Sequence, residues 1–411
     1  MTFQKYLGEK DSELFSLINS EIERQQKCIN LIASENVVSK EILSILGSDL
    51  ANKYAEGYPG SRYYGGCKYI DKIEQIAIDR AKLLFGAESA NVQPHSGSQA
   101  NMAVYNAVLS IGDTVLGMNL NSGGHLTHGA KVNFSGKNYN FISYDVDIET
   151  GYINYDFIQK LADKYKPKLI VCGASAYSRI IDFSKFKKIA DSVNSLLMAD
   201  IAHIAGLVAA GMHPSPVPYA DFVTLTTQKT LRGPRGGIIL CRKKFEDQIN
   251  KSVFPGIQGG PHENVIAAKA FCLKSAMSIE FKDYISKVLK NCKSMSDELK
   301  SLGMNLISNG TDNHLLLIDL SHTNFTGKDL EYMLEKVNII VNKDTIPGDK
   351  RTAREASGIR IGTAAITSRG FNEDDCKTIA NLVFLTYKDF SKNENFIKSE
   401  VNKLTSKYKI Y

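Results

Sequence analysis

One lysine of the sequence stands where a catalytic nucleophile is expected. Lys229 lies in TTQKTLRGPRGG (226–237), shortly after the apolar run DFVTL (221–225), which predicts a buried strand. A lysine attacks carbonyl groups when burial or neighbouring cations lower the pKa of its amine, and Arg232 and Arg235 follow closely. Because most lysines are solvated surface cations, Lys229 by itself does not decide between the two interpretations.

A second stretch, PHSGSQAN (94–101), has the composition of a phosphate site. Its small residues stand where a helix can begin, and the free N–H groups and the dipole of a helix N-terminus attract phosphate. Ser96 and Ser98 add hydroxyl donors, and Gly97 lets the backbone approach a ligand closely. The alternative is an ordinary helix cap, which the same residue types favour.

An aspartate and a histidine are two further candidate functional residues, beside the lysine and the possible phosphate site. Asp200 ends the apolar run SLLMAD (195–200), where a carboxylate can keep the ring nitrogen of a cofactor protonated or can cap a helix. HLTH (125–128) offers an imidazole that can stack on a cofactor ring or serve as a structural hydrogen-bonding group. No third ligand follows at a spacing typical of metal sites. Together, the lysine, the phosphate cradle, the strand-end aspartate and the histidine predict a pyridoxal 5′-phosphate enzyme.

Buried strands must position these side chains. Short apolar runs alternate with helical patterns between residues 90 and 245, which predicts an α/β domain with a largely parallel sheet. The clearest strands are KLIVCGA (168–174), SLLMAD, DFVTL and GGIILC (236–241). Functional groups collect at the carboxyl ends of such strands, so Ser175, Asp200 and Lys229 are expected at one edge of the sheet.

The rest of the chain predicts a smaller second domain and several flanking helices. The stretch 45–66 is irregular and rich in tyrosine and glycine, and ordered segments of this kind often carry function. The βαβ-like pattern after residue 314 predicts the second domain. The remaining predicted elements are helices at 10–29, 70–86, 265–303 and 327–335, strands at 314–320, 337–342 and 358–363, and a surface helix at 388–411.

The composition is that of an ordinary globular protein, with 43% hydrophobic and 23% charged residues over 411 positions. The net charge is +6, but no basic block carries interleaved aromatics, so nucleic acid is not an expected partner. Seven scattered cysteines without a CxxC pair indicate a reducing compartment. Because the N-terminus is polar and no apolar run approaches about 18 residues, we expect a cytoplasmic protein with no membrane partner.

Stretches spread over most of the chain match one known family of pyridoxal phosphate enzymes. They are LIASEN (31–36), NKYAEGYPG (52–60), RYYGGC (62–67), VQPHSGSQAN (92–101), GGHLTHG (123–129), VNFSGK (132–137), SAYSR (175–179), DIAHIAGLVAAG (200–211), KTLRGPRGG (229–237), FPGIQGGP (254–261) and SGIRIGT (357–363). In these motifs and their spacing the chain resembles the serine hydroxymethyltransferases.

The resemblance implies the fold and its division. The implied fold is fold-type I, an α/β architecture similar to that of aspartate aminotransferase, with a large mixed-sheet domain and a smaller C-terminal α/β domain. It divides the chain into an N-terminal helical arm (1–30), a large cofactor-binding domain (31–280) and a small domain (281–411). It also implies a homodimer with shared active sites, or a tetramer built from such dimers.

The resemblance further implies roles for individual residues. Lys229 resembles the lysine that binds the cofactor covalently, Asp200 would pair with the ring nitrogen, and His125 would stack on the ring. The implied catalytic residues are Lys229, Glu56, His125, Asp200 and His203. Cofactor contacts are implied for Ser96, Gly97, Ser98, His125, Ser175, Asp200, His203, Thr226 and Lys229 and, across a dimer interface, for Tyr54, Gly259 and Gly260. Amino-acid contacts are implied for Ser34, Tyr54, Glu56, Tyr64, His203 and Arg360, and folate-side contacts for Glu56, Leu120, Gly124, Leu126 and Asp344. No metal is implied.

The implied reaction is the reversible transfer of the serine hydroxymethyl group to tetrahydrofolate. It passes through aldimine and quinonoid intermediates and gives glycine and 5,10-methylene-tetrahydrofolate. Such an enzyme belongs to one-carbon metabolism and glycine biosynthesis.

The sequence departs from the family pattern near the lysine and on the folate side. Gln228 and Ser122 each replace a histidine, and Asp344 replaces an asparagine associated with the pterin. Thr352-Ala353-Arg354 stands in place of Ser-Pro-Phe, and Ala364 in place of a proline.

These departures leave three hypotheses. The first is a folate-dependent hydroxymethyltransferase. The second is a folate-independent aldolase, or a hydroxymethyltransferase for another β-hydroxy amino acid. The third is a non-catalytic protein on this fold, against which the retained Lys229 and Arg360 argue.

Overall fold

The apolar runs predicted as strands lie side by side in one seven-stranded sheet of the computed structural model, which describes residues 3–411. Its strands are β4 (Ser89–Asn91), β5 (Thr114–Met118), β6 (Asn140–Tyr144), β7 (Leu169–Cys172), β8 (Leu196–Asp200), β9 (Phe222–Thr226) and β10 (Gly237–Cys241). They are ordered β4-β10-β9-β8-β7-β5-β6. The strands from β9 to β6 run parallel, but β10 runs antiparallel to both of its neighbours. The mixed sheet expected from the resemblance is thereby confirmed.

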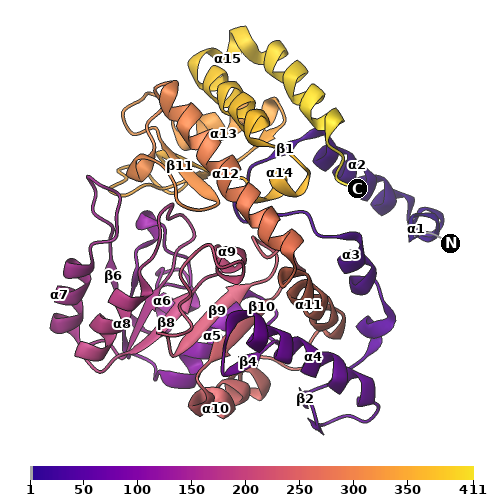
Figure 1. Ribbon diagram of the computed structural model, residues 1–411, viewed down its shortest axis with the longest axis vertical. Coiled ribbons are helices and arrows are strands. Elements are labelled where there is room, and N and C mark those ends of the chain that lie inside the picture. Colours follow the sequence, from indigo (N-terminus) through magenta and orange to yellow (C-terminus); the bar gives the residue numbers. More distant parts are fainter. Residues whose placement is uncertain (1–2) are drawn as a thin grey trace.

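Helices cover both faces of this sheet (Figure 1). Successive side chains of a strand point to opposite faces, so Leu169 and Val171 of β7 pack in one core, and Ile170 and Cys172 pack in another. The first core lies under α5 (Gly97–Val108) and α10 (Glu246–Lys251). The second lies under α4 (Lys68–Phe85), α7 (Tyr155–Tyr165), α8 (Phe183–Ser192), α9 (Ala205–Ala209) and α11 (Glu263–Ala276). The large body is therefore a three-layer α/β structure.

A smaller body is built on the three-stranded antiparallel sheet of β11 (Leu315–Asp319), β14 (Gly358–Gly362) and β13 (Asn342–Asp344), in that order. β14 lies between β11 and β13, an order that a linear pattern does not reveal. The strand expected at 337–342 is mainly β12 (Ile339–Ile340), which pairs outside this sheet. The helices of this body are α12 (Ile279–Ser301), α13 (Gly327–Lys336), α14 (Ala364–Ser368) and α15 (Glu373–Lys407).

Two elements join the bodies. Residues 281–288 of α12 pack in the large core, whereas residues 292–299 pack in the small one. The short strand β1 (Ile29–Asn30) pairs with β12 (Ile339–Ile340), and Ile29 and Leu31 pack in the small core. The division into 1–30, 31–280 and 281–411 stays a proposal, and residues 1–2 of the first segment lie outside the described part of the chain.

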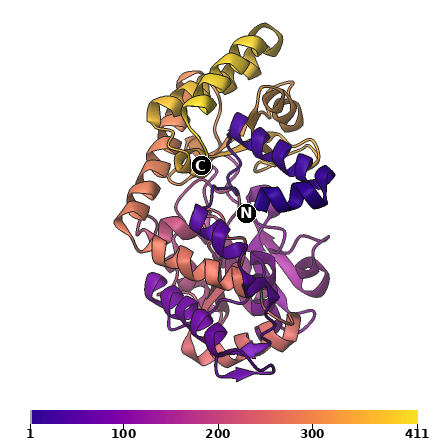
Figure 2. The same cartoon turned by 90° about the vertical axis from the view of Figure 1, so that its right-hand side faces the viewer.

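The N-terminal helices α1 (Phe3–Lys10) and α2 (Ser12–Lys27) project from one side of the molecule, the side that Figure 2 faces. No residue of α2 is buried. The stretch 45–66 follows α3 (Lys40–Leu46) and contains a short hairpin, β2 (Gly57–Tyr58) and β3 (Ser61–Arg62). A further short helix, α6 (Phe134–Asn138), precedes β6.

Two helix predictions need correction in detail. The helix expected at 265–303 is two helices, α11 and α12, and the one expected at 388–411 is the end of α15, which bends at Asp389. All seven cysteines are buried and free. Within residues 3–411, no helix has both the length and the apolarity that crossing a membrane requires.

Candidate active site

A cavity of about 450 Å³ opens at the carboxyl ends of β7, β8 and β9. Parallel strands bring these ends to one edge of the sheet, which is where ligands bind in such folds. Most of the residues expected at the site line this cavity. They are Ser34, Ser96, Gly97, Ser98, Leu120, Gly124, His125, Leu126, Ser175, Asp200, His203, Thr226, Lys229, Asp344 and Arg360.

Lys229 is 8% exposed and lies in the wall of the cavity. Burial lowers the pKa of Lys229 to about 8; Asp200 opposes this effect, whereas Arg360 and Arg235 add to it. A far larger fraction of the amine is therefore uncharged near neutral pH than in a solvated lysine, as a nucleophile requires. Arg232, the other cation that follows Lys229 in sequence, instead lies over the ring of Tyr284, 4.4 Å from its centroid.

Asp200 is held as a carboxylate by a network that begins at His128. The His125 N–H donates to Nδ1 of His128 at 3.2 Å, so Nε2 of His128 carries the ring proton and donates to Asp200 at 3.2 Å. Nδ2 of Asn101 donates to the same carboxyl oxygen at 2.8 Å. Burial acts to raise the pKa of Asp200, but these donors outweigh it and hold the pKa well below its usual range. Asp200 does not cap a helix, because α9 begins only at residue 205.

His125 is a neutral imidazole beside this network. Its Nδ1 lies 2.7 Å from Oγ1 of Thr127, which fixes the ring. Burial and repulsion from His128 lower the pKa of His125 to about 4. The structural interpretation and the stacking interpretation of this histidine are therefore compatible, since His125 makes this anchoring contact and also lines the cavity.

The stretch 94–101 forms a helix cap and leaves N–H groups that could bind an anion. Ser96 caps α5, because its Oγ accepts the Gln99 N–H at 3.2 Å and its carbonyl accepts the Ala100 N–H at 3.0 Å. The N–H groups of Gly97 and Ser98 precede these bonds and are free to bind an anion. A Cβ on Gly97 would lie 2.6 Å from Cγ2 of Thr226, so only glycine fits there without a shift of its neighbour.

The opposite wall of the cavity carries an arginine. Nη1 of Arg360 donates to the Ser175 carbonyl at 2.8 Å, and its Nε donates to Oδ1 of Asn342 at 3.2 Å. The same Nε lies 3.6 Å from a carboxyl oxygen of Asp344. These contacts orient the guanidinium from β14, and within the described chain its Nη2 donates to no protein group. The fork therefore keeps a donor for an anionic substrate.

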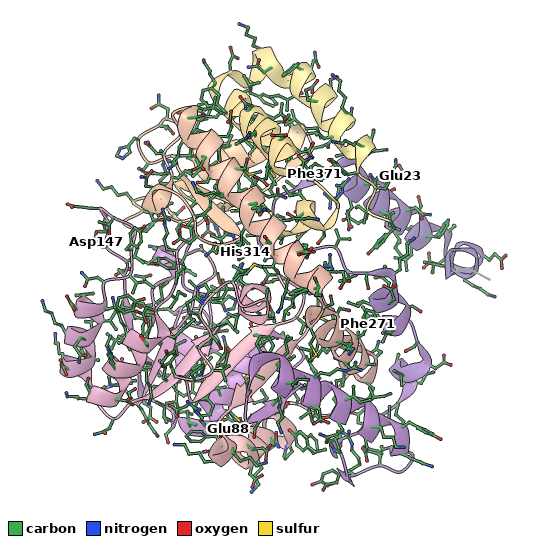
Figure 3. The ribbon with its side chains drawn as sticks, in the orientation of Figure 1. Glu23, Glu88, Asp147, Phe271, His314 and Phe371 are labelled. Atoms are coloured by element: carbon green, nitrogen blue, oxygen red, sulfur yellow. The ribbon has the colours of Figure 1, made fainter. Side chains whose placement is uncertain are left out.

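His203 lies between Lys229 and the small body. Its Nδ1 is 3.3 Å from Nε2 of His314, a completely buried residue (Figure 3 shows His314 between the two bodies). Burial, followed by the charges of Lys229 and Arg360, lowers the pKa of His203 well below its usual value. The imidazole is neutral, so it can act as a hydrogen-bonding group rather than as a cation.

Five of the expected site residues lie outside this cavity and form a group of their own. A Cβ on Gly260 would lie 2.9 Å from the ring of Tyr54, and a Cβ on Gly259 would lie 3.2 Å from Oε1 of Glu56. The rings of Tyr54 and Tyr64 meet edge to face, 5.2 Å apart. Tyr54 is 54% exposed and Tyr64 is 46% exposed. The structure thus gathers these residues on the surface, away from the cavity of the same chain.

A sequence model of the serine hydroxymethyltransferase family matches residues 7–383 of the 411-residue chain. The chain belongs to the serine hydroxymethyltransferase family. Members of this family are pyridoxal 5′-phosphate-dependent transferases of fold-type I that transfer the hydroxymethyl group of serine, so this protein is an enzyme of that class.

The cavity fits the cofactor of the serine hydroxymethyltransferases. An ionised carboxylate, a buried amine of lowered pKa and the free N–H groups at the start of α5 converge on one space. These are the partners of a protonated ring nitrogen, an aldehyde and a phosphate. In residues 3–411, no cluster of three or more side chains is arranged to hold a metal ion.

Four residues at the site of this serine hydroxymethyltransferase were not predicted from the sequence: Asn101, His128, His314 and Glu35. His128 was visible in HLTH, but nothing in the spacing showed which of its two histidines meets Asp200. Asn101 ends the motif PHSGSQAN and His314 begins a predicted strand, but their contacts with Asp200 and His203 arise only from tertiary packing. Glu35 also lines the cavity, next to the expected Ser34.

Proposed function

We propose that this protein transfers the hydroxymethyl group of serine to tetrahydrofolate, giving glycine and 5,10-methylene-tetrahydrofolate. The observation that carries the proposal is the shared cavity of Lys229, Asp200 and Arg360. An amine for the cofactor aldehyde, a carboxylate for its ring nitrogen and a guanidinium for the substrate carboxylate are the groups that the reaction needs.

The bound cofactor supplies an electron sink that lets the Cα–Cβ bond of serine break. Asp200 keeps the proton on the ring nitrogen, because His128 and Asn101 stabilise its charged form. When the cofactor is bound, His125 would lie against its ring, and Ser96, Gly97 and Ser98 would hold its phosphate. Lys229 would hold the aldehyde carbon, because burial leaves part of its amine uncharged.

Arg360 and its neighbours would orient the substrate. The guanidinium takes the carboxylate of serine, and its bonds to Ser175 and Asn342 fix the direction of the fork. Ser34 and His203 line the same space and offer hydrogen bonds to the amino acid. A carboxylate held on one side leaves the Cα–Cβ bond in a defined direction relative to the ring, which favours its cleavage over that of the other bonds at Cα.

The surface group is assigned to the cavity of a second subunit. We propose a homodimer in which Tyr54, Glu56 and Tyr64 of each chain reach the substrate in the partner, with Glu56 as the acid/base at the serine hydroxyl. Gly259 and Gly260 would add N–H donors to the partner's phosphate. The exposure of the two tyrosines in the single chain, which a partner subunit would cover, supports this arrangement.

Folate is proposed to enter beside Leu120, Gly124 and Leu126, with Asp344 at the inner end. One observation favours a second candidate function, a folate-independent cleavage of β-hydroxy amino acids. Asp344 replaces the usual amide and lies 3.6 Å from Arg360, so it is committed in part to that cation. Burial raises the pKa of Asp344, and Arg360 opposes the rise.

The deciding assay measures glycine formation from L-serine with and without tetrahydrofolate, alongside cleavage of L-allo-threonine without it. We expect serine turnover that depends strongly on tetrahydrofolate. Cleavage of threonine alone, with no response to folate, would establish the second candidate instead.

In Lys229→Ala, the absorbance band of the lysine-bound cofactor should disappear, and a variant that keeps this band would refute the role of Lys229. The seven buried, free thiols support the cytoplasmic location that we propose.

A further inference from the structure

A second buried lysine lies close to the phosphate cradle. Lys269 is 1% exposed, and its side chain leaves α11 toward the end of β4. Its Nζ donates to three backbone carbonyls: Val92 at 2.6 Å, Gly237 at 2.9 Å and Pro94 at 3.0 Å. We propose that Lys269 is a positioning residue for the cofactor phosphate, which it serves by holding the segment that presents Ser96. This inference rests on the proposed function of the cavity.

The three carbonyls call for the ammonium form of Lys269. An ammonium has three N–H donors, whereas a neutral amine has two and would direct its lone pair at a carbonyl oxygen. Burial lowers the pKa of Lys269 to about 7, and Glu74 on α4 opposes the fall. His95, whose own pKa is lowered in part by Lys269, is the other titratable group that senses this charge. Where Lys269 is protonated, its three bonds place a cation at the Pro94 carbonyl, two residues before Ser96.

The segment that Lys269 holds has little other backbone support. Lys269 binds the Val92 and Pro94 carbonyls, and Nε2 of Gln258 donates to the Gln93 carbonyl between them at 3.0 Å. The Gly237 N–H also donates to Pro94 at 3.0 Å. Side chains thus hold three consecutive carbonyls in place of a strand ladder.

This segment leads directly into the cradle. A Cβ on Gly237 would lie only 2.4 Å from the Ser96 carbonyl oxygen, so the two backbones are in close contact. By binding the Gly237 and Pro94 carbonyls together, Lys269 fixes the segment before Ser96 against β10. In contrast, none of its hydrogen bonds reaches Lys229 or Asp200, which hold the other end of the cofactor.

Loss of the Lys269 ammonium should weaken binding of the phosphate group and leave binding of the rest of the cofactor nearly unchanged. Lys269→Met keeps an unbranched side chain that reaches as far as Cε, and it removes the ammonium group with its charge and donors. The probes are pyridoxal 5′-phosphate and pyridoxal, each titrated into the full-length protein after removal of the cofactor, with the absorbance of the lysine-bound form as the signal. We expect the affinity for pyridoxal 5′-phosphate to fall at least about tenfold, the scale expected for lost charge-assisted hydrogen bonds, and that for pyridoxal to change less than about twofold.

Two further variants distinguish the loss of the ammonium from the loss of neutral hydrogen bonds and from a failure to fold. Gln258→Met removes neutral hydrogen bonds from the same segment, so it should weaken binding of the phosphate form less than Lys269→Met does. If Lys269→Met does not fold, Gly236→Ala replaces it, because the added Cβ would lie 2.4 Å from Cε of Lys269 and displace the ammonium while keeping the lysine. Equal weakening of both probes, or no weakening, overturns the positioning role. If wild type and Lys229→Ala bind pyridoxal 5′-phosphate alike, the proposed function of the cavity has failed instead.

Discussion

Replacing the buried Glu263 by glutamine should make the protein less sensitive to rising pH. Glu263 begins α11 and is 1% exposed, and neither of its carboxyl oxygens has a hydrogen-bond partner within the described chain. Burial, and then repulsion from Glu74, raises the pKa of Glu263 from 4.5 to about 8, against the attraction of Arg62. The native carboxyl is therefore neutral at pH values at which the unfolded one is ionised.

The sign of the effect follows from proton binding. Between pH 4.5 and about 8 the folded protein keeps a proton on Glu263 that the unfolded chain has released, so the free energy of unfolding falls as the pH rises through this window. At about 1.36 kcal/mol per pKa unit, the difference between 4.5 and 8 sets a ceiling of about 5 kcal/mol. Water penetration and side-chain relaxation reduce this ceiling, so we expect about 2 kcal/mol.

The assay is urea-induced unfolding, followed by circular dichroism, of wild type and Glu263→Gln from about pH 5 to about pH 9. Because glutamine does not ionise, the stability of the variant relative to wild type should increase by about 2 kcal/mol across this range. Glu23→Gln is the matched control, because the Glu23 side chain is 69% exposed. Figure 3 labels Glu23 on α2. The stability difference between this variant and wild type should not change with pH. A difference between Glu263→Gln and wild type that stays constant, or that shrinks as the pH rises, would refute a neutral Glu263.

Three further predictions concern the cavity. His128→Ala removes a hydrogen bond to a charged group, worth about 1.5–3 kcal/mol, and should lower kcat for serine about 10- to 100-fold, measured at saturating cofactor. Arg360→Lys loses the planar fork and should raise the KM for serine at least about tenfold while the absorbance of the bound cofactor is unchanged; an unaltered KM would contradict the carboxylate role. Gln228→His restores the usual family residue and, if Gln228 weakens the use of folate, should increase the ratio of serine turnover with tetrahydrofolate to that without it.

The sequence alone predicts four of the seven strands of the large sheet, β7, β8, β9 and β10. Residues 169–172, 196–200, 222–226 and 237–241 are apolar because both faces of the sheet are covered, and a buried strand needs no polar alternation. Strand direction is not encoded in such runs, so the antiparallel course of β10 could not be predicted. The insertion of β14 between β11 and β13 was hidden for the same reason, because it depends on pairing between distant segments.

Prediction of the site depended on how each residue reaches it. Asp200 and Lys229 follow predicted strands, and parallel topology then brings them to the same edge of the sheet. Lys269 gave no such signal, because a lysine in a helical pattern is ordinarily assigned to the solvent face. Its burial becomes meaningful only when Val92, Pro94 and Gly237, from two separate segments, turn their carbonyls toward it.

The structure also shows which departures from the family pattern lie where they could affect the use of tetrahydrofolate. Ser122 is buried and donates to Asp145 at 2.7 Å, so that departure is satisfied locally. Thr352-Ala353-Arg354 is exposed, and among the departures in the described chain only Gln228 and Asp344 line the cavity. Gln228 precedes Lys229 in sequence, whereas Asp344 lies 3.6 Å from Arg360. The first departure therefore adjoins the cofactor lysine, and the second adjoins the arginine proposed to bind the substrate carboxylate. A double variant that restores histidine and asparagine at these positions therefore tests whether the acceptor changed: if it responds to tetrahydrofolate as wild type does, the departures do not determine the use of folate.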